Sequence, residues 1–138
     1  MASTEPDKPQ TVAAAIDTIE ATYELMLAYA AQGRKAEADD PLGVRDALRR
    51  ADAALDLLAA ATPEQVGSPG GAVAAATADM LAVLKRDVAQ ARAAIRFVLA
   101  QRTIGSQIID NLNASIHIRA LLTDIFLLDE AFEETDPA

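Results

Sequence analysis

The side chains that could carry out chemistry are few in this chain of 138 residues, which has one histidine and no cysteine. Without cysteine there can be no thiolate metal site and no thiol nucleophile. One histidine cannot supply the two Glu-x-x-His motifs of a di-iron bundle, and the sequence has neither a glycine-rich phosphate loop nor a nucleophile elbow. We therefore expect no catalytic residue, no metal site and no cofactor, and predict that the protein is not an enzyme.

His117 is the one residue that offers an alternative function. A histidine on a helical bundle can carry a phosphoryl group, and the chain resembles histidine phosphotransfer domains in size and shape. Those domains have lysine and glycine shortly after the histidine, whereas Ile118, Arg119 and Ala120 follow His117 here. Phosphotransfer or signalling through His117 is kept as the alternative, and it requires an exposed imidazole ring.

A line of basic residues, Lys85, Arg92 and Arg96, follows one flank of the longest predicted helix. Such a strip can dock an acidic partner or a phosphate group. However, a chain with a formal net charge of −9 has many carboxylates of its own, and neighbouring helices can pair with the same cations. We favour pairing within the chain and keep the acidic-partner strip as the alternative.

Apolar residues recur at steps of three and four along four stretches, which is the spacing of one face of a helix. The predicted helices cover residues 9–32, 41–61, 72–101 and 106–132. Alanine, the best helix former, fills much of the remaining sequence. The sequence therefore predicts an all-α fold, an antiparallel four-helix bundle with short loops.

Glycine and proline mark the breaks between these helices. Residues 63–71, PEQVGSPGG, must form a surface loop. Gly105 would weaken a continuous helix by about 1 kcal/mol and Ser106 can act as an N-cap, so we expect a break there. The alternative is one helix from Ala72 to Phe132, which would make the protein an obligate oligomer.

The last predicted helix, 106–132, carries two apolar stripes on nearly opposite sides of its cylinder. Asn111, Asn113 and Ser115 lie at the changeover, and they are poor residues for a helix interior. Either the helix kinks there, or one half packs in the bundle and the other half meets a partner. We predict that the second half forms a partner or oligomer interface through Ile118, Leu121, Leu122, Ile125, Phe126 and Leu128.

One helical domain, residues 9–132, is expected between a disordered N-terminal tail at 1–8 and an acidic C-terminal tail at 133–138. The sequence shows no secretory signal and no apolar stretch long enough for a bilayer, so we expect a cytoplasmic location. The acidic charge opposes binding to nucleic acid or to an anionic membrane.

Arg50-Ala51 and the segment Gly70-Gly71-Ala72-Val73-Ala74 resemble the middle of the flagellar export chaperones. The resemblance covers only this part of the chain and implies a small helical bundle that wraps a partner's helical tail. The function we predict is that of a non-catalytic interaction protein: a homo-oligomeric adaptor, a chaperone-like protein or an accessory subunit. We expect it to bind itself, as a dimer, or another protein's helix; a small-ligand carrier is a further alternative.

Overall fold

The computed structural model describes residues 11–37, 43–66 and 71–133, and all regular structure in these ranges is helical. The helices are α1 (Val12–Ala30), α2 (Val44–Ala59), α3 (Gly71–Leu99), α4 (Ser106–Ala114) and α5 (Ile116–Glu133). The prediction of an all-α fold is confirmed. The predicted N-terminal tail lies outside the described residues, as does the predicted C-terminal tail except for Glu133, the last residue of α5.

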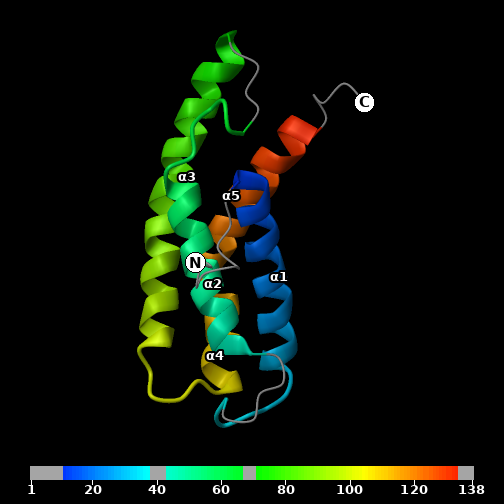
Figure 1. Ribbon diagram of the computed structural model, residues 1–138, viewed down its shortest axis with the longest axis vertical. Coiled ribbons are helices and arrows are strands. Elements are labelled where there is room, and N and C mark those ends of the chain that lie inside the picture. Colours follow the sequence, from blue (N-terminus) through cyan, green and yellow to red (C-terminus); the bar gives the residue numbers. More distant parts are fainter. Residues whose placement is uncertain (1–10, 38–42, 67–70, 134–138) are drawn as a thin grey trace, which may run out of the picture.

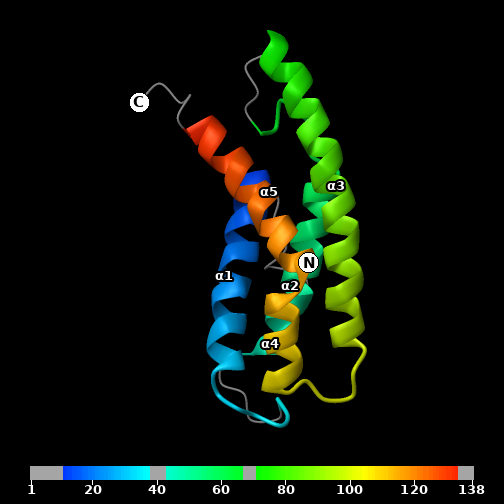
Figure 2. The ribbon, with the colours of Figure 1, turned by 180° about the vertical axis from the view of Figure 1, so that it is seen from behind.

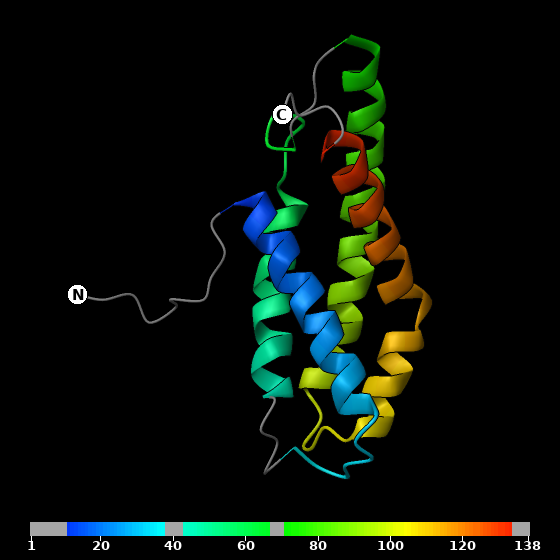
Figure 3. The same ribbon diagram turned by 90° about the vertical axis from the view of Figure 1, so that its right-hand side faces the viewer.

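Successive helices alternate in direction, except that α4 and α5 follow one another along the same direction (Figure 1). α1 packs against α2 and α4, and α3 packs against α2 and α5. α3 has 29 residues and α2 has 16, so at 1.5 Å per residue α3 is about 20 Å longer. α3 therefore extends well past α2 at one end, as Figures 1 and 3 show.

The two ends of the molecule differ, and we name them by the helix ends that they contain. The open end holds the first turns of α1 and α3 and the last turns of α2 and α5 (Figure 1). The tied end holds the last turns of α1 and α3 and the first turns of α2 and α4 (Figure 1).

The helix predicted over residues 106–132 is broken into α4 and α5, so the described residues form five helices and a four-helix bundle is not confirmed. Ser115 makes the break, because its backbone is extended, with φ of −65° and ψ of 148°. Its hydroxyl donates to the Leu112 carbonyl oxygen at 2.7 Å and accepts from the Ile118 amide at 3.3 Å. This side chain thus caps the end of α4 and the start of α5. Of the two alternatives for this segment, the kink is the one observed.

The break at Ser115 allows both apolar stripes to face inward. A residue outside the helical conformation resets the direction of the side chains that follow, so the two stripes no longer lie on opposite sides of one cylinder. Ile109 and Leu112 of α4 are buried, and so are Leu121 and Ile125 of α5. Mostly aliphatic side chains from α1, α2 and α3 complete the core.

At the tied end, an arginine and a glutamate hold the linker between α3 and α4. Arg45 of α2 donates to the Leu99 carbonyl oxygen at 2.8 Å and to the Gln101 carbonyl oxygen at 3.0 Å. Arg45 also pairs with Glu37, which accepts from the Ile104 amide at 2.7 Å. These bonds give partners to backbone groups at both ends of the linker, as is needed where Ile104 packs into the core.

Tyr29 and Ser106 fix the start of α4 to the end of α1. The Tyr29 hydroxyl donates to the Ile104 carbonyl oxygen at 2.5 Å. The Ser106 hydroxyl donates to the Tyr29 carbonyl oxygen at 2.7 Å and accepts from the Arg34 amide at 2.8 Å. The predicted break between α3 and α4 is therefore confirmed, although Gly105, and not Ser106, occupies the N-cap position. A Cβ on Gly105 would lie 3.0 Å from two backbone carbonyl oxygens, so this close approach requires glycine.

Candidate functional site

The six side chains predicted to form an interface lie mostly inside the monomer. Five of them are at most 8% exposed: Ile118, Leu121, Leu122, Ile125 and Leu128. Phe126 is 51% exposed. The break at Ser115 accounts for this placement, because it turns the apolar stripe of α5 into the core. The six residues therefore form no continuous surface patch, and their contact with a partner stays a prediction.

Two residues of the predicted basic strip, Arg92 and Arg96, form ion pairs, and the third, Lys85, is exposed to solvent. Arg92 Nε lies 2.9 Å from Asp52 Oδ1, and Arg96 Nε lies 3.2 Å from the same oxygen. Burial acts to raise the pKa of Asp52, but the hydrogen bonds and charges of the two arginines lower it overall. A second contact joins Arg92 to Asp56 at 3.0 Å. Pairing with a neighbouring helix is thus confirmed for Arg92 and Arg96, whereas the Lys85 side chain is exposed.

His117 lies in the first turn of α5, beside the break. The residue is half-buried, and its Nδ1 atom is buried with no hydrogen-bond partner in the described part of the chain. A phosphoryl donor does not reach Nδ1 in this arrangement, so phosphotransfer would have to use the other ring nitrogen.

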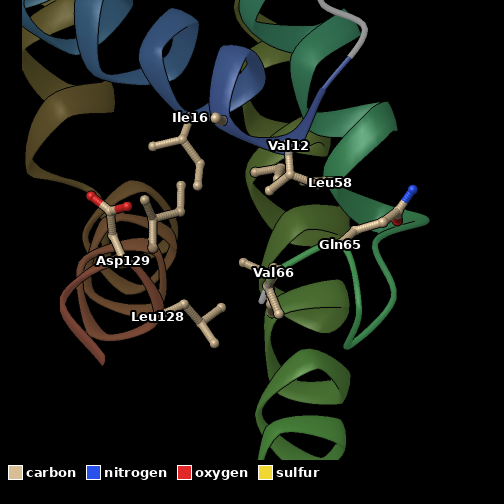
Figure 4. Close-up of a pocket in the computed structure, with 10 residues that line it drawn as sticks. Val12, Ile16, Leu58, Gln65, Val66, Leu128 and Asp129 are labelled. Atoms are coloured by element: carbon tan, nitrogen blue, oxygen red, sulfur yellow. The ribbon is translucent and has the colours of Figure 1, made fainter. Parts of the chain in front are cut away.

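An apolar pocket of about 300 Å³ lies at the open end (Figure 4). It is formed by α1, α2, α3, α5 and the loop that follows α2. Its apolar lining consists of Val12, Ala13, Ile16, Leu58, Val66, Leu84, Ile125 and Leu128. Two polar residues, Gln65 and Asp129, complete the lining. Figure 4 shows Val12, Ile16 and Leu128 directed into the space between the helices.

The pocket exists because α2 ends too early to fill this end of the core. Beyond Ala59 the chain makes a turn in which the Thr62 amide donates to the Gln65 side-chain oxygen at 2.9 Å, and the Gln65 amide donates to the Thr62 hydroxyl at 3.3 Å. Only one large apolar side chain of this described turn, Val66, reaches the pocket.

The opposite wall of the pocket is also incomplete. α5 diverges from α3 toward the open end, as Figures 1 and 2 show. Within the described ranges, α1 and α5 are not packed as closely as the neighbouring helix pairs. The pocket is thus an unfilled part of the core between helices that separate.

Carboxylates gather where α1 faces α5 beside the pocket. Asp129 lines the pocket, and Glu20 of α1 lies near it. Burial raises the pKa of Glu20, and the charges of Asp129, Asp17 and Glu24 raise it further. We call these four residues the acidic edge. The sequence of α1 contains no lysine or arginine, so this helix offers no cation of its own to offset them.

A buried carboxyl group of α5, that of Asp124, lies beside the half-buried Asp87 of α3 next to the pocket. Asp124 is 6% exposed; burial, followed by the hydrogen bond and charge of Asp87, raises its pKa to about 7. Asp124 directly precedes Ile125, and Asp87 lies one turn beyond Leu84, so both acids adjoin residues that line the pocket. The Oδ2 atom of Asp124 is buried and has no hydrogen-bond partner among the described residues, so the uncharged form of this side chain is favoured in the folded protein.

The described ranges contain no group of three or more His, Asp or Glu side chains arranged to hold a metal ion. None of the helices in these ranges combines the length and the hydropathy needed to cross a bilayer. The open end provides an apolar pocket with a charged edge, which suits the binding of an apolar group. A pocket of about 320 Å³ at the tied end has a mainly polar lining that includes Arg34, Lys35 and Asp110.

Two residues of the predicted interface, Ile125 and Leu128, line the pocket, but the pocket itself was not predicted from the sequence. The lengths of the predicted helices could have indicated it. A helix over residues 41–61 is too short to pack along the full length of a helix over residues 72–101. The glycine- and proline-containing segment 63–71 also predicts a loop at the end of the second predicted helix, where a longer helix would have filled the core.

Comparison of the chain with protein-family models, curated proteins and solved structures gives no match. The resemblances to phosphotransfer domains and to flagellar export chaperones gain no support from it. The class of protein therefore follows from the fold and the pocket alone: an all-helical chain whose core is unfilled at one end.

Proposed function

We propose that this protein is a non-catalytic interaction module that binds an apolar helical segment of another protein at its open end. The observation that carries the proposal is the pocket of about 300 Å³, whose lining is apolar except for Gln65 and Asp129. Helices commonly bind by laying an apolar face into a groove between other helices. Because α5 diverges from α3 toward this end, a further apolar stripe would complete the core there.

The size of the pocket limits how tightly such a segment binds. Burial of an aliphatic side chain contributes about 1.5–3 kcal/mol, and association costs at least about 4 kcal/mol. A cavity of about 300 Å³ takes only a few such side chains. With three such side chains, at most about 5 kcal/mol remains after that cost, so we expect a dissociation constant of about 0.1 to 1 mM.

A small apolar ligand is the alternative occupant of the same pocket. Ligand pockets range from about 300 to 1,000 Å³, so this one is at the lower limit. Such sites also carry several placed polar groups that orient the ligand. Here only Gln65 and Asp129 are polar, and the cavity lies between separating helices, so a helix is the better fit.

The test is a titration with a designed amphipathic peptide of roughly 14 residues, about four helical turns, with a leucine stripe and a glutamine face. We expect the methyl resonances of Val12, Val66 and Leu128 to shift on binding. The Val66→Asp variant should not bind, because it places a charge in the pocket. The matched control, Leu27→Asp, changes a side chain that is already 47% exposed and should bind normally. Circular dichroism verifies that both variants are folded.

Absence of these shifts, or equal binding by the two variants, would contradict the proposal. Shifts at the same methyl groups with a small apolar compound, and none with the peptide, would assign the pocket to a small-ligand carrier.

Self-association is a second candidate, and it rests on a different observation. Phe126 and Leu127 are consecutive on α5 and are 51% and 58% exposed. A dimer formed through them should become monomeric in the Phe126→Asp/Leu127→Asp variant, as measured by light scattering across a dilution series. A monomer at every concentration in the unmodified protein would show that the predicted homo-oligomer is wrong.

A further inference from the structure

We propose that the segment bound at the open end is a basic amphipathic helix, with lysine or arginine along the edge that faces α1 and α5. This inference rests on the proposed function, because it names the chemistry of the partner for the same pocket. The juxtaposition that carries it is an apolar cavity bordered on one side by the acidic edge.

Three of the four residues of the acidic edge lie on the apolar lining or within one helical turn of it, whereas Glu24 is two turns beyond Ile16. Asp17 is one turn beyond Ala13, and Glu20 is one turn beyond Ile16, and both apolar neighbours line the pocket. Asp129 lines the pocket itself (Figure 4). A helix whose apolar stripe entered the pocket would bring its flanking residues to these carboxylates, since residues three or four apart are neighbours on a helix.

The opposite side of the pocket does not offer the same charge. Near Leu84, α3 carries the exposed cations Lys85 and Arg86 as well as the acids Asp79 and Asp87. Charges of both signs give no net attraction for a cation. The partner's basic residues are therefore assigned to the edge between α1 and α5, and the α3 side is left to neutral or mixed residues.

Like-charge crowding at the acidic edge supports this assignment. Burial and three neighbouring carboxylates raise the pKa of Glu20, so its ionised form is destabilised in the free protein. A cation placed among these groups would relieve the repulsion, and electrostatic complementarity of this kind mainly determines which partner binds.

Other occupants fit the site less well. Residues 1–10 precede the pocket in the chain, but their only large apolar residue is Met1. A second copy of the chain carries a formal charge of −9, so it would be repelled from the acidic edge. The same repulsion applies to an anionic membrane.

The experiment compares three peptides of roughly 14 residues that share one leucine stripe and differ only along one flank, which is lysine, glutamine or glutamate. At low ionic strength we expect the lysine peptide to bind about tenfold more tightly than the glutamate peptide, with the glutamine peptide between them. Added salt should reduce this difference, because the carboxylates are near the surface.

Matched charge variants test whether the preference for the lysine peptide depends on the acidic edge. Glu20→Gln/Asp129→Asn should bring the lysine and glutamine peptides to nearly equal affinity. The control Asp46→Asn/Asp110→Asn removes two exposed carboxylates at the tied end and should leave the preference unchanged.

The outcomes separate the two proposals. Equal binding of all three peptides, or a preference for glutamate, would overturn the basic-helix inference and leave the proposed function standing. Loss of the preference in the control variant as well would also overturn it, because the effect would then be one of total charge. Failure of every peptide to bind would overturn both.

Discussion

The tied end and the open end of this molecule are built by different means. At the tied end, Arg45, Glu37, Tyr29 and Ser106 satisfy the polar backbone groups of the connecting segments with hydrogen bonds between 2.5 and 3.0 Å. At the open end, the helices differ in length and separate, and the result is an apolar cavity of about 300 Å³.

In our proposal, this difference makes one end of the core rigid and leaves the other able to bind a partner. A linker can pack against a core only if its amides and carbonyls are satisfied, and the tied end uses four side chains for this. At the open end, α2 stops at Ala59, and a space remains beside the apolar side chains that line the pocket. Unfilled apolar space lowers the free energy of unfolding, and a partner that binds only the folded protein raises it again.

The largest expected contrast is between two apolar truncations, one at each end. Ile104→Ala removes a side chain that is 0% exposed, and it should lower the free energy of unfolding by about 2–5 kcal/mol. Val66→Ala, beside the existing cavity, should lower it by less than about 1 kcal/mol, because the side chain is only partly buried. Urea denaturation of both variants measures the contrast, and equal losses would show that the open end is packed as tightly as the tied end.

Arg45→Ala should be the next largest effect. It removes bonds to two linker carbonyl oxygens and the partner of Glu37, so we expect a loss of about 2–3 kcal/mol in unfolding free energy. Arg49→Ala is the matched control, since Arg49 forms only an exposed pair with Asp46 at 3.3 Å and should cost about 0.5 kcal/mol or less. Similar stabilities for the two variants would mean that the arginine network does not hold the tied end.

We expect the buried carboxyl group of Asp124, beside Asp87, to make stability depend on pH. Unfolded Asp124 loses its proton near its ordinary pKa of 3.8, whereas burial and Asp87 keep it protonated in the folded protein up to about 7. The folded state therefore binds an extra proton between these values. The stabilisation is complete below about pH 4 and is lost as the pH rises through 7, at no more than about 1.4 kcal/mol per pH unit.

Asp124→Asn removes this titration, so its stability should fall less steeply than that of the unmodified protein between pH 4 and about 7. Thermal unfolding across this range measures the difference between the two proteins. Asp110→Asn, an exposed acid on α4, is the control and should keep the original slope. Parallel slopes for Asp124→Asn and the unmodified protein would show that folding does not raise the pKa of Asp124.

The smallest expected effect concerns the first turn of α1. The Thr11 hydroxyl accepts from the Ala14 amide at 3.0 Å and caps the helix that supplies Val12 and Ile16 to the pocket. Thr11→Ala should cost about 1 kcal/mol and weaken peptide binding, because fraying moves two lining residues. Calorimetry and the peptide titration measure the two effects; unchanged affinity with lowered stability would mean that this turn does not shape the pocket.

The sequence predicted the helical class, the position of most helices and the break before Ser106, because these follow from local periodicity and from glycine and proline. It could not decide whether the chain kinks at Ser115 or continues, since the two alternatives have the same local pattern. That single choice determines whether Leu121 and Ile125 face the core or a partner, and only the packing of α5 against α3 resolves it.

The pocket and the acidic edge were harder to predict for a different reason. Both depend on residues far apart in the sequence: Val12 and Glu20 from α1, Val66 from the loop, and Asp129 from α5. Their proximity results from the difference in length between α2 and α3, which is a property of the assembled helices. The pairing of Arg92 and Arg96, in contrast, was predicted because an acidic chain offers many partners to any cation.

Hydrogen exchange with and without the lysine-flanked peptide tests most directly whether binding occurs at the open end and not at the tied end. We predict slower exchange at residues 12–20, 62–66 and 125–129 in the complex, and no change at 29–37 or 99–109. Protection at the tied end, or exchange that is the same throughout the chain with and without peptide, would contradict the account.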